Sequence, residues 1–162
     1  MVIVLLIILL AVCFTGVIFF GAPYLPTLHK QQDDVLDLLA LKPGQTLIEL
    51  GCGDGRMLRT AASKGLTVIG YELNPILVFV SYLVTYKYRK QVSVRWGNFW
   101  AKDWPPTDAI YVFLLDKYMK KLDKKIIQQY KGKHVKVVSY AFTIPTKKPI
   151  KTHEALFLYE YK

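Results

Sequence analysis

The stretch Thr46-Leu47-Ile48-Glu49-Leu50-Gly51-Cys52-Gly53-Asp54-Gly55-Arg56 decides which fold the chain is expected to adopt. Its first five residues are an apolar run of strand length, and Arg56 begins a helical pattern that ends near Lys64. The glycines between them permit positive φ angles and a close approach of a ligand to the backbone. A strand, a glycine-rich loop and a helix in this order predict a site for a nucleotide-like ligand at the carboxyl edge of a parallel sheet.

Two carboxylates restrict the choice of ligand. Glu72 follows the second expected strand, where a carboxylate can accept hydrogen bonds from both hydroxyls of a ribose. Glu49 precedes the loop, where it would repel a diphosphate but could hold the ammonium group of a methionine moiety. The G-x-G-x-G spacing also lacks the third glycine of the dinucleotide fingerprint. These features favour S-adenosyl-L-methionine over NAD, and a structural glycine turn in another α/β domain is the alternative.

The remaining sequence alternates between strand and helix patterns. Expected strands cover 46–50, 67–71, 92–95, 109–114, 135–140 and 155–161, and expected helices cover 33–39, 56–64, 75–88 and 117–130. The alternation predicts an α/β fold: a Rossmann-like, mostly parallel sheet with helices on both faces. No helix separates the last two strands, so the last strand is expected to run antiparallel at the edge of the sheet.

The first part of the chain has a different character. Residues 2–20 contain no charged residue, and as a helix they would extend about 28 Å, close to the thickness of a bilayer core. We expect a transmembrane anchor over 1–21, a proline-containing linker over 22–30 and a catalytic domain over 31–162. A cleaved signal peptide is the alternative, but it would need a basic start and a small-residue cleavage site. Lys30 and Lys42 follow the run, which predicts a single-pass membrane protein whose domain faces the cytoplasm.

The charge of the chain suggests an anionic partner. The formal net charge is +10, and lysines recur through the expected helix at 117–130. Nucleic acid, anionic lipid or acidic protein could bind such a surface, and an ordinary solvated basic face is the alternative. The histidines are scattered and suggest no metal site. The two cysteines, Cys13 and Cys52, give no disulfide framework.

A loop of aromatic and amide residues follows the third expected strand. Within Trp96-Gly97-Asn98-Phe99-Trp100, Asn98 could hydrogen-bond an adenine and Phe99 could stack on it. Packing of the aromatic rings beneath the loop is the alternative.

Several motifs together resemble a known family. E-L-G-C-G-D-G-R and G-Y-E-L-N-P resemble the class I, seven-strand S-adenosylmethionine-dependent methyltransferases. With P-Y-L-P-T and V-F-L-L-D-K-Y-M-K-K-L, the chain is similar to membrane-anchored lysine N-methyltransferases that modify the adenine nucleotide translocase and the c subunit of ATP synthase. The resemblance implies that residues 24–27 fold over the methionine end of the cofactor. The full predicted cofactor-binding set is Glu49, Gly51, Cys52, Gly53, Gly55, Glu72, Leu73, Asn98, Phe99, Tyr24 and Thr27.

Three functions fit these observations. The first is methylation of a lysine in a membrane-associated protein, with contact to the bilayer through residues 2–20. The second is a methyltransferase for a small or lipid-like molecule, and the third is a membrane-tethered nucleotide-binding module without catalysis. Nucleic acid is not an expected substrate. Methyl transfer from a sulfonium depends mainly on positioning, so we assign no catalytic base.

Overall fold

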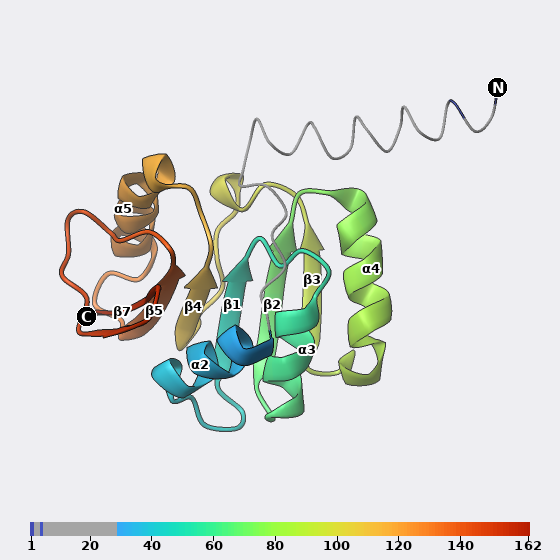
Figure 1. Cartoon of the computed structure of the whole chain (residues 1–162), viewed down its shortest axis with the longest axis horizontal. Helices are drawn as coiled ribbons and strands as arrows, with labels where there is room; N and C mark the ends of the chain where they lie inside the picture. Colours follow the sequence, from blue (N-terminus) through green and yellow to red (C-terminus); the bar gives the residue numbers. More distant parts are fainter. Residues whose placement is uncertain (2–3, 5–28) are drawn as a thin grey trace.

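A computed structural model of the chain describes Met1, Val4 and residues 29–162. These residues form one sheet with helices packed against it (Figure 1). The described elements are α2 (His29–Leu39), β1 (Thr46–Leu50), α3 (Arg56–Ser63), β2 (Thr67–Glu72), α4 (Pro75–Thr85), η1 (Tyr86–Tyr88), β3 (Val92–Trp96), η2 (Phe99–Ala101), β4 (Ala109–Val112), η3 (Asp116–Tyr118), α5 (Met119–Gln129), β5 (Val135–Tyr140), β6 (Lys151–His153) and β7 (Leu156–Tyr161).

The sheet has seven strands in the order β3-β2-β1-β4-β5-β7-β6. Strands β1 to β5 pair in parallel, and β7 runs antiparallel to both of its neighbours, β5 and β6. The chain moves from β1 outward to β3 and then crosses to β4 on the other side of β1. The strand order therefore reverses beside β1, and open α/β sheets bind ligands at such a point.

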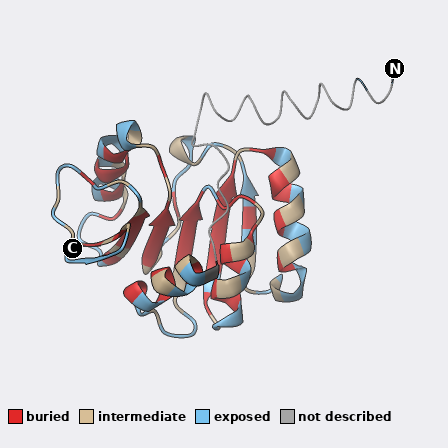
Figure 2. Cartoon of the chain, viewed as in Figure 1, coloured by how far each residue is buried: buried red, intermediate tan, exposed pale blue. Residues whose placement is uncertain are grey.

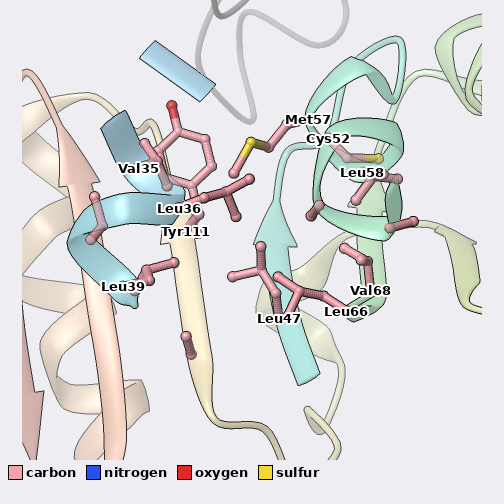
Figure 3. Packing of buried hydrophobic residues seen from close by; sticks show 14 of the residues in the cluster. Val35, Leu36, Leu39, Leu47, Cys52, Met57, Leu58, Leu66, Val68 and Tyr111 are labelled. Atoms are coloured by element: carbon pink, nitrogen blue, oxygen red, sulfur yellow. The ribbon is translucent and has the colours of Figure 1, made fainter. Parts of the chain in front are cut away.

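Two apolar layers lie on opposite faces of the sheet. Alternate residues of a strand point to opposite faces, so Leu47 joins the layer under α2, α3 and α4, while Ile48 joins the layer under α5. Figure 2 shows the central strands buried along their length, and Figure 3 shows side chains from α2, β1 and α3 meeting in the first layer. This double coverage explains why the central strands β1 and β4 are mostly apolar and buried.

The end of the chain corrects one expectation. Residues 156–161 do run antiparallel to β5, but they do not form the edge of the sheet. The edge strand is β6, which turns into β7 through Glu154 and Ala155. Strand β6 has three polar, exposed residues, so it lacks the apolar alternation by which strands are recognised.

Two other expected boundaries shift by a few residues. The helix expected at 75–88 ends as a 3-10 turn, η1, and the helix expected at 117–130 begins with one, η3. Tight turns of this kind are common at helix ends.

The predicted anchor and linker lie outside the described residues, apart from Met1, Val4, His29 and Lys30, and the last two belong to α2. Within the described part of the chain, no helix has both the length and the apolar character needed to cross a bilayer. The divisions at 1–21 and 22–30 therefore remain predictions.

A close approach of α3 to the sheet depends on Gly70 in β2. A Cβ atom at this position would lie 2.6 Å from Cδ1 of Leu58 and 2.7 Å from Sγ of Cys52. We expect Gly70→Ala to lower the free energy of unfolding by about 1–3 kcal/mol, the usual cost of overpacking a core. Urea unfolding will measure the change, with Ser93→Ala on the exposed side of β3 as the control. Equal stability of the two variants would contradict this account of the packing.

Candidate cofactor site

The glycine-rich loop is fixed to the carboxyl end of the neighbouring strand. The backbone N–H groups of Gly51 and Cys52 both donate to the carbonyl oxygen of Tyr71, each at 2.9 Å. Gly51 has a φ of 90°, and a Cβ atom there would meet nothing within 4 Å. The glycine is therefore needed for the direction of the chain, and the space beside it is open to a ligand.

Glu72 is held in place by the backbone around it. Its Oε2 accepts a hydrogen bond from the N–H of Gly53 at 2.9 Å, and its Oε1 accepts from the N–H groups of Leu73 and Asn74, each at 2.8 Å. The residue is buried and ends β2, as the sequence predicted. Each carboxylate oxygen has more than one acceptor position, so a fixed carboxylate can also receive hydroxyl donors.

Glu49 is the most unusual group in the site. Its side chain is buried, and Oε2 has no hydrogen-bond partner. Burial raises the pKa of Glu49 well above its ordinary value, and the negative charges of Asp54 and Glu72 raise it further. A buried carboxylate without a partner is costly, and a cationic group placed against it would remove that cost.

The loop continues through Asp54 and Gly55 into α3. The guanidinium of Arg56 donates from Nε and Nη2 to the carboxylate of Asp54, at distances from 2.7 to 3.0 Å. Gly55 has a φ of 79°, and a Cβ atom there would lie 2.7 Å from Oγ of Ser81. This glycine is therefore required by both its conformation and the approach of α4.

Ser81 helps to hold the glycine-rich loop in place, and the sequence did not single it out. It is fully buried in α4, and its hydroxyl donates to the carbonyl oxygen of Gly53 at 2.8 Å. Its signal in the sequence is a small hydroxyl residue within a mostly apolar helical segment, which indicates no contact until α4 is known to pack against the loop.

Cys52 contributes its backbone rather than its thiol to the loop. The side chain is buried, and Sγ lies 3.9 Å from Oγ of Ser81. Burial raises the pKa of the Cys52 thiol, and the charges of Glu49 and Glu72 add to that effect. The thiol is therefore held in its neutral, unreactive form.

The loop after β3 comes close to Glu72 through its backbone, because the N–H of Gly97 donates to the carbonyl oxygen of Glu72 at 2.9 Å. Asn98 is exposed, and its Oδ1 accepts from the N–H of Trp100 at 2.9 Å, which caps η2. The ring of Phe99 packs against Trp100 and Trp104, with centroids 4.7 and 6.3 Å away. Both residues thus have a structural role, and their contact with adenine remains a prediction.

The predicted set is therefore brought together only in part. Hydrogen bonds and side-chain contacts connect the glycine-rich loop with β2 and with the turn after β2. The predicted residues brought together in this way are Gly51, Cys52, Gly53, Gly55, Glu72 and Leu73. Asn98 and Phe99 lie in the adjacent loop, and Tyr24 and Thr27 are outside the described residues.

These residues fit S-adenosylmethionine. Glu49 offers a buried, partnerless oxygen to an ammonium group, Glu72 offers a fixed carboxylate to a ribose, and Gly51 leaves open space beside the backbone. With the strand order β3-β2-β1-β4-β5-β7-β6 and an antiparallel β7, they define a class I S-adenosylmethionine-dependent methyltransferase. An RNA methyltransferase from Salinibacter ruber, solved with S-adenosyl-L-homocysteine, has the same fold: TM-score 0.73 and 25% identity, over 85% of this chain and 92% of that one.

Sequence comparison identifies the family more narrowly. A family model described as the ANTKMT methyltransferase domain matches residues 49–151, so the chain belongs to that family. The human lysine N-methyltransferase of the ATP synthase C subunit is 30% identical over 76% of this chain and 53% of its own length. The mouse adenine nucleotide translocase lysine N-methyltransferase is 33% identical over 79% of this chain and 56% of its own length. The chain thus spans about half the length of these two relatives, and the family resemblance seen in the sequence is confirmed.

Replacing Glu72 tests its place in the site. We expect Glu72→Ala to weaken binding of S-adenosyl-L-homocysteine by about 1.5–3 kcal/mol, the range for hydrogen bonds to a charged group. Isothermal titration calorimetry will measure the affinity, and circular dichroism will verify the fold, because the variant also loses three backbone contacts. Asp116→Ala, at an exposed carboxylate after β4, is the matched control. Unchanged affinity in a folded Glu72→Ala variant would place the cofactor elsewhere.

Replacing Glu49 tests its effect on stability separately from its effect on cofactor binding. Because its pKa is raised in the folded chain, the folded state binds a proton more strongly than the unfolded state, and stability falls as pH rises from the ordinary carboxyl pKa through the raised one. We expect Glu49→Gln to lack this loss, so that its stability relative to wild type improves by up to about 1.4 kcal/mol per pH unit in that window. The same variant should bind the cofactor at least about tenfold more weakly, since it lacks the charge that holds an ammonium group.

Urea unfolding across that pH window and calorimetry with S-adenosyl-L-homocysteine will measure the two effects. If the free energy of unfolding changes with pH in the same way for wild type and Glu49→Gln, then Glu49 is not the group that causes the loss of stability.

Proposed function

We propose that the chain transfers methyl groups from S-adenosylmethionine to a lysine side chain of a protein. The observation that carries the proposal is the pair of buried carboxylates at the ends of two adjacent strands. Backbone amides fix Glu72, and Oε2 of Glu49 has no hydrogen-bond partner. The two relatives described above differ in their named targets but share lysine N-methylation, and that shared chemistry supports the reaction proposed for this chain.

The residues of the site have separate roles in this proposal. Glu49 holds the ammonium group of the cofactor, and Glu72 receives its ribose hydroxyls. S-Adenosylmethionine supplies a methyl group on a cationic sulfur. After losing one proton to water, the lysine nitrogen would form the new bond to the methyl carbon as the carbon–sulfur bond breaks. The electron pair of that bond would stay on sulfur, S-adenosyl-L-homocysteine would leave, and the methylated nitrogen would lose a second proton to water. Positioning supplies most of the rate enhancement of such a transfer, so a dedicated base is not required.

An aromatic pair beside the loop is suited to receive the lysine stem. Tyr140 ends β5, Phe113 follows β4, and their rings meet edge to face with centroids 5.1 Å apart. Val112 pairs with Leu50, the residue before the loop, so Phe113 lies next to the carboxyl end of β1. The hydroxyl of Tyr140 accepts a hydrogen bond from Nε2 of Gln31 at 2.7 Å, which connects the pair to α2. Aromatic faces also favour a nearby cation such as a methylated ammonium group.

We further propose that the target is associated with a membrane. The uncharged run at residues 2–20 would keep the protein at a bilayer, with the catalytic domain on the cytoplasmic side. Confinement to the membrane raises the effective concentration of the enzyme toward membrane-bound targets.

Methyl transfer from labelled S-adenosylmethionine to host membrane extract tests the function. We expect a labelled protein band whose mass spectrum contains a methyl-lysine, and no label with Glu72→Ala. Phe113→Ala should raise KM for the protein by about tenfold, as loss of an aromatic contact predicts, and should leave cofactor affinity within about twofold. Label in the lipid, metabolite or RNA fraction, with none in protein, would contradict the proposal.

A further inference from the structure

Helix α4 has an unusual pattern, because its outer side is as apolar as its inner side. Its sequence, P-I-L-V-F-V-S-Y-L-V-T, contains no charged residue. The side facing the sheet includes the buried hydroxyl residues Ser81 and Thr85, whose Oγ atoms donate to the carbonyls of Gly53 and Ser81. Leu77 and Val78 are also buried, but further large apolar residues lie on the outer side. Surface helices usually present charged residues to water, so this face is suited to another environment.

The outer face is a continuous stripe, which we call the α4 stripe. It consists of Phe79, Tyr82, Leu83 and Tyr86, which are 63%, 53%, 62% and 65% exposed. These positions follow the spacing i, i+3, i+4 and i+7, so they lie on one side of the helix and its 3-10 extension. Helix α4 stands at one end of the molecule beside the edge strand β3, and its exposed and half-buried positions can be followed in Figure 2.

Trp96 extends the stripe toward the cofactor site. It is 67% exposed at the end of β3, and its Nε1 donates to the carbonyl oxygen of Leu73 at 3.1 Å. Tyr82 is similarly anchored, because its hydroxyl donates to the carbonyl oxygen of Val94 at 2.8 Å. Aromatic rings fixed through a polar atom, with their apolar parts exposed, are typical of surfaces at a membrane–water boundary.

The charged residues that directly follow the stripe have one sign. Residues 55–102 contain eight Lys or Arg residues, of which Arg56 and Lys64 pair with Asp54 and Asp33, and a single acidic residue, Glu72, which is buried in the cofactor site. Three of the cations, Lys87, Arg89 and Lys90, are exposed directly after the stripe, and the guanidinium of Arg89 lies 4.8 Å from the centroid of the Tyr86 ring. An apolar face with a basic border is suited to a surface that is apolar inside and anionic at its boundary.

We infer that the α4 stripe docks on an anionic phospholipid surface. A second copy of the chain is a poor occupant, because pairing through this face would bring two acid-free basic borders together. The uncharged run at residues 2–20 could cover the apolar residues but would leave the cations without partners. A bilayer with anionic headgroups satisfies both features, and it places the cofactor end of α4 near the membrane. The inference does not depend on methyl transfer.

A nitroxide on the stripe tests the inference in the full-length chain. Leu83→Cys in a Cys13→Ala background carries the label, since Cys52 is buried and unreactive. Ile127→Cys is the matched control, because Ile127 is an apolar residue of α5, 53% exposed, under the other face of the sheet. Accessibility to a water-soluble nickel complex is measured on vesicles of phosphatidylcholine with and without phosphatidylglycerol.

We expect the label at position 83 to become several-fold less accessible on the anionic vesicles, and the label at position 127 to remain accessible. Lys87→Gln with Lys90→Gln should reduce the docked fraction relative to the undocked fraction by about fivefold per charge, from the strength of the attraction of a lysine to an anionic surface. Phe79→Cys supplies a second reading if the variant at position 83 misfolds.

Three outcomes would overturn the inference. In the first, position 83 stays accessible on anionic vesicles, or positions 83 and 127 change alike. In the second, spin–spin broadening appears without lipid, which would identify a second copy of the chain as the occupant. In the third, position 83 is equally inaccessible on vesicles with and without phosphatidylglycerol, which would show that anionic lipid is not what covers it.

Discussion

The parallel pairing of β1 with β2 is the constraint on which the rest of the site depends. It places Leu50 opposite Tyr71, so the carbonyl oxygen of Tyr71 can accept from the first two amides of the loop. The same register brings Glu49 and Glu72 to one edge of the sheet, where their negative charges lie close enough to raise the pKa of Glu49. A slip of one residue would turn Glu49 to the opposite face. The register therefore positions both the backbone and the charges of the site.

The two carboxylates are stabilised in different ways. Glu72 accepts three backbone hydrogen bonds, which satisfy a buried carboxylate without any ligand. Glu49 is buried with one oxygen that has no partner, and folding alone does not compensate for its desolvation. A protein retains such a group where a ligand completes it, so the uncompensated burial of Glu49 is better evidence for a cationic ligand than the glycine-rich loop alone.

The sequence predicted those parts of the structure that depend on local patterns. Thr46–Leu50 and Val135–Tyr140 were predicted with their observed bounds, because short runs rich in apolar and β-branched residues, bordered by turns, are strong strand signals. Strand β6 was missed, because three polar residues at an edge have no such signal. Gly70 and Ser81 were missed for another reason, since their importance comes from contacts with Leu58 and Gly53, which are distant in the sequence. The contacts of Asn98 and Phe99 are local, with Trp100 and Trp104, and they agree with the packing that had been kept as an alternative for the loop.

The unusual distribution of polar and apolar residues in α4 follows from its contact with the glycine-rich loop on the inner side. The loop backbone leaves the carbonyl oxygen of Gly53 facing the helix, and Gly55 allows the helix to come close, so the inner side must supply a small donor such as Ser81. A large residue at that position would separate α4 from the loop. The inner face therefore buries Leu77 and Val78 but no apolar side chain at positions 81 and 85, while Phe79 and Leu83 lie outside. Burial of that outer side against a bilayer would add stability to the helix that begins shortly after Glu72, so membrane contact and the cofactor site would share one element.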